Sequence, residues 1–310
     1  MKNKKDKDGF KIDFIGIGAP RCATTWIFEC LKEHPEICGS SKKEIHFFDK
    51  PHRFRKGKGY YASFFEHCSD RKLWGEYTPS YLHYKKAPSR MYNYFPDAKL
   101  LVSLRNPVER AYSHYRRGKI NKSRLGHYDN FREAVERDPV VVEKGFYFKQ
   151  LKRYYKYFPQ ENILIQFYKD LKKNPKNFIQ NIYDFLGVES VDFTPSSLNS
   201  KQGTTGGKLY DYKLPLFNDI LWSVWNRITP PDRYGVLPRF LKKAGVRDLG
   251  KFILKWNKKC KNKVENKPSK VDNIDQSTRR YLYGVYSDDI VKLENFINKD
   301  LSHWKQDGRR

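Results

Sequence analysis

The sequence predicts an α/β fold, a parallel β-sheet flanked by helices, in a single large domain with a helical C-terminal part. Three short apolar segments carry this prediction, at 12–18, 99–104 and 162–168, and each is followed by a stretch with helical spacing. Parallel strands require crossover connections, which are usually helices. Three strand-to-helix units therefore indicate one sheet with helices on its faces, and 310 residues are enough to bury its core.

The first unit starts with the sequence IDFIGIG at 12–18, an apolar segment that ends in glycine. A loop with Pro20 follows, and the spacing then predicts a helix over 25–33. The apolar residues that share one face of this helix are Trp26, Ile27, Cys30 and Leu31.

The second and third units repeat this pattern. The segment KLLVSL at 99–104 predicts a buried strand, and Pro107 stands at a first-turn position of a helix that runs to about Arg117. The segment NILIQFY at 162–168 predicts another strand, and Asn174 is a suitable N-cap for the helix after it. These two units complete the predicted parallel sheet.

The rest of the chain is assigned by composition. Helical spacing predicts helices over 145–158 and 277–304, whereas 187–208 is rich in Ser, Thr, Gly and Asn, as long loops are. Residues 239–270 hold 12 Lys and Arg but only two Asp and Glu, around apolar residues at helical spacing. This segment predicts a basic amphipathic helix.

The predicted domain boundaries follow from these assignments. Residues 1–11 form a basic tail, and 12–310 form one domain. Within it, 12–186 is the core, and 187–310 supplies loops and helices that are expected to close over the ligands.

The charge of the chain points to an anionic partner. Its 62 Lys and Arg against 35 Asp and Glu give a net charge of +27, while 16% aromatic residues argue against a disordered protein. Such an excess fits a nucleic acid, a phosphorylated cofactor, an acidic glycan or a membrane surface, and charge alone does not choose among them.

The cysteines and the N-terminal segment predict a compartment. Five cysteines, an odd number at scattered spacings without a CxxC pair, predict reduced thiols rather than a disulfide framework or a metal site. The apolar stretch near the N-terminus is too short for a signal peptide or a membrane span. We therefore expect a soluble, cytoplasmic protein.

The loop over 16–25, GIGAPRCATT, lies where a strand-to-helix turn can bind a phosphate. It is P-loop-like, but a Walker loop would have glycine at Ala23 and lysine at Thr24, and only the hydroxyl of Thr25 matches. With Arg21 as its cation, the loop suits a 5′-phosphate or a sulfate that needs no metal. The alternative is an ordinary strand-to-helix turn.

A second candidate site follows the second predicted strand. Arg105 ends that strand and Ser113 lies eight residues further on, so both can face the carboxyl edge of the sheet. A guanidinium and a hydroxyl together make a good receptor for a second phosphate.

These two motifs resemble a known family. PRCATTW at 20–26 and LRNPVERAYSHY at 104–115 are similar to the cofactor signatures of sulfotransferases that use 3′-phosphoadenosine 5′-phosphosulfate (PAPS). The resemblance implies that Arg105 and Ser113 bind the 3′-phosphate. It also implies that the first loop binds the 5′-phosphosulfate through Arg21, Cys22, Ala23, Thr24, Thr25 and Trp26.

Three details of the first loop stay open in this comparison. The family often has lysine at the position of Arg21, and arginine donates a proton to the leaving oxygen less readily. It usually has glycine at Ala23. Trp26 either stacks on the adenine or is a core residue at the start of a helix.

Other segments resemble the heparan-type members of the same family. KEIHFF at 43–48 is similar to a segment whose glutamate deprotonates the acceptor, which implies Glu44 as the catalytic base, with His46 as an alternative base or a packed histidine. EYTPSY at 76–81 resembles a segment near the acceptor, and 289–304 resembles the C-terminal helix and tail of bacterial members.

The resemblance implies a reaction and its partners. PAPS would donate a sulfuryl group to a hydroxyl or amine, with adenosine 3′,5′-bisphosphate (PAP) as the product and no metal required. The KEIHFF segment favours a carbohydrate acceptor, such as an acidic glycan or a glycolipid, and no nucleic acid is expected as a partner. Peripheral contact with a membrane is compatible with the basic segment at 239–270.

Two other functions remain open at this stage. A P-loop nucleotide kinase would need a phosphate-binding lysine and Mg²⁺. A basic protein that binds nucleic acid or a membrane surface would bind in a strongly salt-dependent manner and catalyse no reaction.

Overall fold

The computed structural model describes residues 10–68, 73–120, 123–189, 193–199, 210–212, 258–260 and 274–305. The chain divides into two compact units, of which the larger comprises 1–204 and 272–310 and the smaller comprises 205–271. In the smaller unit, β6 (Tyr210–Tyr212) pairs with β7 (Lys258–Cys260) in antiparallel fashion. The prediction of a helix is therefore wrong for 258–260, because these residues find a strand partner. The rest of the predicted basic helix and the glycine-rich loop at 203–207 lie outside the described residues.

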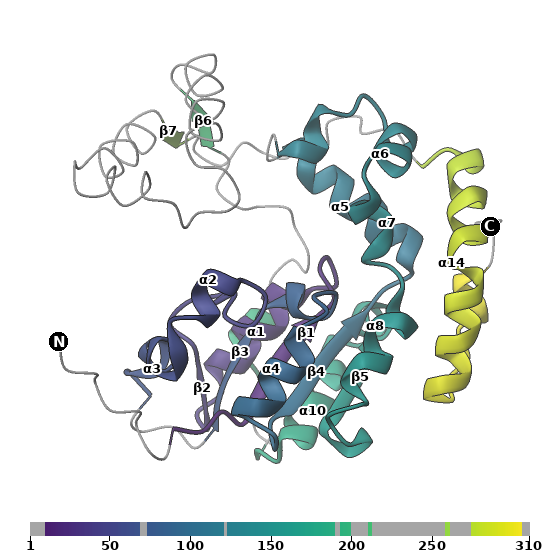
Figure 1. The fold of residues 1–310 in the computed structure, drawn as a ribbon. Helices are drawn as coiled ribbons and strands as arrows, with labels where there is room; N and C mark the ends of the chain where they lie inside the picture. The colour runs from purple at the N-terminus through teal and green to yellow at the C-terminus, as the bar shows by residue number, and fades with distance from the viewer. Residues whose placement is uncertain are drawn as a thin grey trace. The chain divides into compact units, whose positions relative to one another are not determined.

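The larger unit is built on one parallel sheet, which confirms the predicted fold class (Figure 1). Three of its strands are the predicted ones: β1 (Phe14–Gly18), β4 (Lys99–Leu104) and β5 (Ile163–Phe167). Two strands were missed, β2 (Ile37–Gly39) and β3 (Leu73–Tyr77). Three residues are too few for a sequence pattern, and β3 contains a glycine and a glutamate, which rarely signal a buried strand.

The strand order is β2-β3-β1-β4-β5, so β1 is central. Ile15 of β1 lies opposite Glu76 of β3 on one side and opposite Leu100 of β4 on the other. Since all strands run in one direction, the loops that follow β1, β2, β3 and β4 gather at the same edge.

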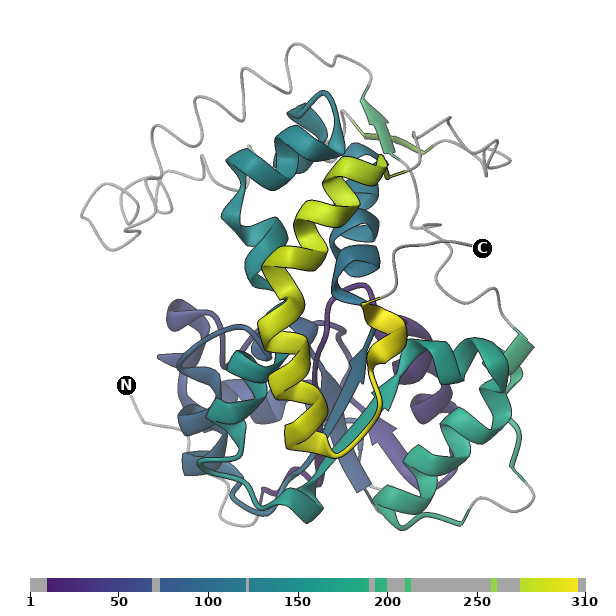
Figure 2. The ribbon, with the colours of Figure 1, turned by 90° about the vertical axis from the view of Figure 1, so that its right-hand side faces the viewer.

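Helices cover both faces of the sheet. α1 (Thr24–Glu33) and α10 (Pro175–Leu186) pack on the face that presents Phe14. The face that presents Ile15 is covered by α4 (Ala87–Tyr94), α5 (Pro107–Ile120), α8 (Tyr147–Tyr154) and α14 (Gln276–Ile297). α14 lies along α5 and α8 (Figure 2). The shorter helices are α2 (Pro51–Phe54), α3 (Gly57–Ala62), α6 (Phe131–Arg137), α7 (Pro139–Glu143) and α9 (Tyr168–Lys173).

Capping residues explain where two of these helices begin or end. The Asn174 side chain accepts a hydrogen bond from the backbone of Asn177 at the start of α10, as predicted. The C-terminal helix is shorter than predicted, because Asn298 adopts the left-handed conformation and ends α14. A separate 3₁₀ turn (Ser302–Trp304) then follows.

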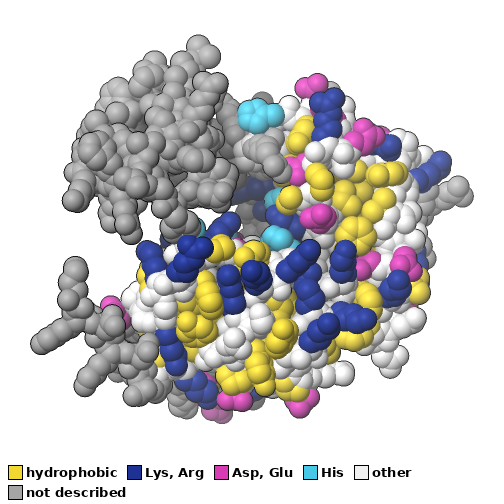
Figure 3. All heavy atoms as spheres, in the orientation of Figure 1, with side chains coloured by type: hydrophobic (Ala, Val, Ile, Leu, Met, Phe, Trp, Pro, Cys, Tyr) yellow, Lys and Arg dark blue, Asp and Glu magenta, His cyan; other side chains and the backbone are white. Residues whose placement is uncertain are grey.

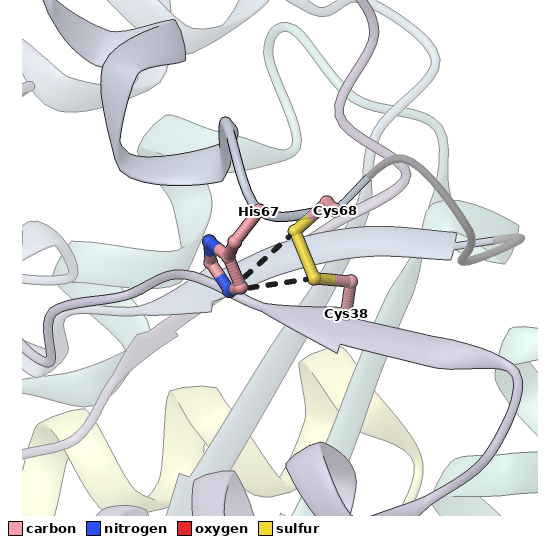
Figure 4. A group of neighbouring side chains, drawn as sticks. All are labelled: Cys38, His67 and Cys68. Atoms are coloured by element: carbon pink, nitrogen blue, oxygen red, sulfur yellow. Dashed lines mark hydrogen bonds between the residues drawn. A yellow bond between two sulfur atoms is a disulfide. The ribbon is translucent and has the colours of Figure 1, made fainter.

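A disulfide corrects the prediction of five reduced thiols. Cys38 on β2 is bonded to Cys68, and the Cα atoms are 5.7 Å apart. The Nε2 atom of His67 lies 3.6 Å from Sγ of Cys38 and 3.7 Å from Sγ of Cys68 (Figure 4). The partners are 30 residues apart in the sequence, and only the folding of the intervening segment onto β2 brings them together. The predicted cytoplasmic location was based partly on reduced thiols, and that argument no longer holds. The location itself stays a prediction.

Cys22 and Cys30 are free and buried. Among the described residues, none of the helices is both long enough and apolar enough to cross a membrane.

The disulfide should stabilise the fold. Reduction with a phosphine should lower the free energy of unfolding by about 3–4 kcal/mol, because the bond closes a 30-residue loop in the unfolded chain. The melting temperature should then fall by on the order of 10 °C, measured by circular dichroism with and without reductant. The double variant Cys38→Ser/Cys68→Ser is the control, since its melting temperature should not respond. A wild-type protein that is equally insensitive would contradict the bond.

Candidate active site

The loop after β1, residues 19–23, has a backbone suited to holding an anion. Arg21 and Ala23 lie in the left-handed region, with φ of 74° and 60°, which costs a non-glycine residue about 1–2 kcal/mol. Ala23 is the N-cap of α1, and among the described residues no side chain caps this helix. The first-turn N–H groups of α1 therefore face the loop, and together with the helix dipole they favour a bound anion.

The side chains of this loop differ in what they can offer. Cys22 is fully buried, and burial raises the pKa of its thiol to about 11, so it remains a neutral core residue. Thr24 is also buried, whereas Thr25 is exposed. A ligand would thus meet the backbone N–H groups in the first turn of α1, which begins at Thr24, and in addition the hydroxyl of Thr25.

The two predicted phosphate motifs meet in the structure. Nε of Arg21 donates a hydrogen bond to Oγ of Ser113 at 3.2 Å, although 92 residues separate them. Ser113 lies on α5, which follows β4 and Arg105. The guanidinium of Arg105 lies 3.5 Å from the carboxylate of Glu109 and stacks 5.0 Å from the ring centroid of Tyr168.

This part of the site carries a concentrated positive charge. Burial and the nearby positive charges of Arg117 and Arg105 together lower the pKa of Arg21 to about 10. Guanidinium groups that weaken one another's protonation in this way are stabilised when an anion binds between them. The cluster of Arg21, Arg105 and Arg117 is therefore a receptor for phosphate or sulfate.

Glu44 and His46 lie on the segment that follows β2. Oε2 of Glu44 is 3.2 Å from Nε2 of His46, and Nδ1 of the same ring is 2.9 Å from Oδ2 of Asp49. Ser80 completes the group, because its hydroxyl donates to Asp49 at 2.6 Å. His46 thus bridges two carboxylates.

Hydrogen bonds that His46 donates to Asp49 and Glu44 raise the pKa of His46 to about 9. Burial by itself would raise the pKa of Glu44, but the hydrogen bond from His46 and the charge of Lys43 hold it below its usual range. At neutral pH, Glu44 is therefore a carboxylate and His46 beside it is an imidazolium. Because an imidazolium has no free lone pair on nitrogen, His46 loses support as the alternative base, whereas Glu44 keeps a partly exposed carboxylate.

Tyr77 connects this group to the anion-binding loop. Its hydroxyl donates to the carbonyl of Gly18 at 2.9 Å, and Nζ of Lys43 lies 5.7 Å from its ring centroid. The ring crosses β1 at Gly16, where a Cβ atom would approach it to 2.2 Å. Nζ of Lys43 also lies 3.8 Å from the carboxylate of Glu44. Glu44 and the loop after β1 consequently lie at the same edge of the sheet.

Trp26 is placed as a core residue. Its Nε1 donates to the carbonyl of Ser197 at 2.8 Å, and its ring packs 6.1 Å from that of Phe178. Only 5% of the residue is exposed. These contacts favour the core interpretation of Trp26, and stacking on an adenine stays a prediction.

Two members of the site were not singled out from the sequence. Asp49 follows His46 by three residues, a spacing that was available as a signal, and Ser80 lies in the EYTPSY segment. That the EYTPSY segment lies near the acceptor stays a prediction, and within the segment Glu76 is set apart by its burial. It is fully buried in the sheet, so it cannot touch a substrate.

Comparison with known proteins finds relatives that are named as sulfotransferases. The chain is 31% identical over 183 residues to heparan sulfate glucosamine 3-O-sulfotransferase 6 from Homo sapiens, which covers 56% of this chain and 52% of that protein. It is 25% identical over 270 residues to the membrane-associated sulfotransferase kil1 from Dictyostelium discoideum, with 58% and 57% covered. The chain therefore spans only about half the length of the curated relatives it matches.

A similar fold occurs in a solved structure. The crystal structure of a sulfotransferase from Alicyclobacillus acidocaldarius matches with a TM-score of 0.65 and 22% identity, covering 96% of this chain and all of that one. The family model described as "Sulfotransferase domain" matches residues 11–202, from the start of β1 through the sheet and past α10. Because this match spans more than half of the sequence, the chain belongs to the sulfotransferase domain family.

Proposed function

We propose that this protein transfers a sulfuryl group from PAPS to a hydroxyl or amine of a carbohydrate acceptor. The observation that carries the proposal is the hydrogen bond from Arg21 to Ser113, because it joins the two predicted anion sites into one receptor. PAPS carries two anionic groups, which match these two sites. The family match favours this function over the nucleotide kinase and the simple polyanion binder that the sequence also allowed.

The donor would be bound by charge and by backbone dipoles. The N-terminal turn of α1 and Arg21 would hold the 5′-phosphosulfate, and Arg105 with Ser113 would hold the 3′-phosphate. The stacking of Arg105 on Tyr168 and its contact with Glu109 fix the guanidinium before any ligand arrives. All these positive groups come from the chain itself, and the expectation that no metal is required remains part of the proposal.

Bound PAPS supplies the sulfuryl group, whose bond to the bridging phosphate oxygen breaks as a new bond to the acceptor oxygen forms. Glu44 takes the proton of the acceptor hydroxyl, and Arg21 stabilises the negative charge that builds up on the departing PAP. His46 donates to Glu44 and is itself held by Asp49, so it orients the base. Glu44, oriented by His46, thus carries out the proton transfer, and Arg21 stabilises the charge of the leaving group.

The acceptor class rests on charge and on the named relatives. Many Lys and Arg side chains lie on the described part of the face shown in Figure 3, consistent with the net charge of +27. The relatives from Homo sapiens and Mus musculus with the names of heparan sulfate sulfotransferases act on an acidic glycan by those names. An acidic glycan is therefore the proposed acceptor. The sugar of a glycolipid is the alternative acceptor if the protein acts at a membrane.

Loss of Arg105 should weaken binding of PAP. Arg105→Ala removes a charge-assisted contact worth about 1.5–3 kcal/mol, so the dissociation constant should rise roughly tenfold to a hundredfold. Isothermal titration calorimetry with PAP measures this change. Arg132→Ala is the matched control, because Arg132 likewise contacts a glutamate one turn away and lies over a tyrosine ring, but on α6. If Arg105→Ala weakened adenosine 5′-phosphate binding equally, Arg105 would not read the 3′-phosphate.

Loss of the carboxylate of Glu44 should slow turnover without affecting the donor. Glu44→Gln keeps the volume but cannot take up a proton, so kcat should fall by about 10²- to 10⁴-fold while the affinity for PAP stays within twofold. The assay follows ³⁵S from labelled PAPS into a desulfated heparan oligosaccharide. Glu66→Gln, at an exposed position after α3, is the control and should keep wild-type turnover. Near-normal turnover in Glu44→Gln would remove Glu44 as the base.

A further inference from the structure

Glu76 is a buried carboxyl group that the proposed mechanism does not use. It lies on β3 beside the central strand and is 0% exposed. Three hydroxyl groups donate to it: Thr78 Oγ1 at 2.6 Å, Tyr81 Oη at 2.7 Å and Tyr61 Oη at 3.2 Å. A carboxylate without contact to solvent is costly, so its retention here calls for a reason beyond packing.

Two of these hydroxyls also hold the segment that carries the proposed base. Tyr81 Oη accepts a hydrogen bond from the backbone N–H of Phe47 at 2.9 Å. Thr78 Oγ1 accepts one from the backbone N–H of His46 at 3.4 Å. Glu76 is therefore connected, through one hydroxyl on each side, to two successive peptide groups.

We infer that Glu76 is a positioning residue that fixes the backbone at His46 and Phe47, and thereby the placement of Glu44. The inference rests on the proposed function of Glu44 as the base.

The direction of the hydrogen bonds explains why a carboxylate is needed. A carboxylate only accepts, so it draws the protons of both hydroxyls toward itself and leaves their lone pairs facing the two N–H groups. An amide at this position would donate on one side, so the hydroxyl there would have to accept from it, and its own proton would lose the Glu76 acceptor inside the protein. The hydroxyl would then turn, and its connection to the backbone N–H would be weakened.

The backbone at His46 needs such support. Its φ is 55°, a left-handed conformation that an L-residue rarely adopts and that costs about 1–3 kcal/mol. The Nε2 contact to Glu44 at 3.2 Å and the Nδ1 contact to Asp49 at 2.9 Å both depend on where this backbone lies. Burial raises the pKa of Glu76 to about 7, against the opposing effect of the three hydroxyl donors, so the purely accepting carboxylate prevails above that pH.

The first test uses Glu76→Gln and needs no activity. In the wild type, the imidazole of His46 should titrate near pH 9, because Asp49 and Glu44 hold its proton. In Glu76→Gln its pKa should fall by one unit or more toward the ordinary value of about 6.5. NMR of ¹³C-labelled histidine measures this, and the loss of one of the eight histidine signals in His46→Gln assigns the resonance.

The matched control is Asp289→Asn. Asp289 is another buried carboxylate with well-defined donors, since it accepts from the backbone N–H groups of Phe148 and Lys149 at 3.0 and 3.1 Å. It lies on α14, away from the segment that carries Glu44. Asp289→Asn should lower the melting temperature and leave the pKa of His46 unchanged.

The second test measures turnover and donor binding together. Glu76→Gln should lower kcat at least tenfold, with the affinity for PAP unchanged, because the anion-binding loop does not contact Glu76. Thr78→Val removes the connection from Glu76 to the backbone of His46, and Tyr81→Phe removes the connection to Phe47. Each variant should lower the pKa of His46 and kcat by part of the amount expected for Glu76→Gln. These two variants carry the test if Glu76→Gln fails to fold.

The outcomes separate the inference from the proposed function. An unchanged pKa of His46 in folded Glu76→Gln, or a loss of kcat that only matches that of Asp289→Asn, would overturn the positioning role. A wild-type protein that binds no PAP and transfers no sulfuryl group, in which Glu76→Gln still shifts the pKa of His46, would overturn the proposed function and leave the positioning role in place.

Discussion

The pairing of β1 with β3 on one side and with β4 on the other is the interaction on which the site depends. It places the loop after β1, the segment after β3 and the start of α5 side by side at one edge of the sheet. Without this register, Arg21 and Ser113 would not meet, and Tyr77 would not reach Gly18. The backbone pairing of the strands therefore determines which side chains of the candidate site can meet.

The edge is divided into two electrostatic halves. The half around Arg21 and Arg105 gathers positive charge, with backbone N–H groups of α1 added to it. The half around Glu44 and Asp49 holds negative charge balanced by the protonated His46. The proposed sulfuryl transfer would benefit from this separation, because the positive half would attract the anionic donor and the negative half would take up the proton of the acceptor.

Much of the fold was predictable from local patterns. Strands β1, β4 and β5 are apolar segments followed by helices, and Asn174 caps α10 as its position indicated. β2 was not predictable, since its three residues are held by pairing with β3 rather than by any propensity of their own. The disulfide between Cys38 and Cys68 was missed for a related reason, because it joins residues that only the folded chain brings together.

For the candidate site, the sequence by itself determined the residue types and their resemblance to a family: Arg21, Arg105 and Ser113 for anions, and Glu44 for the proton. Only the tertiary structure decided how they act, since the pKa of His46 depends on its contacts with Glu44 and Asp49 and the role of Glu76 on its burial. The physical reason is that residue chemistry is carried by the chain, whereas burial, charge proximity and hydrogen-bond direction arise between segments far apart in sequence.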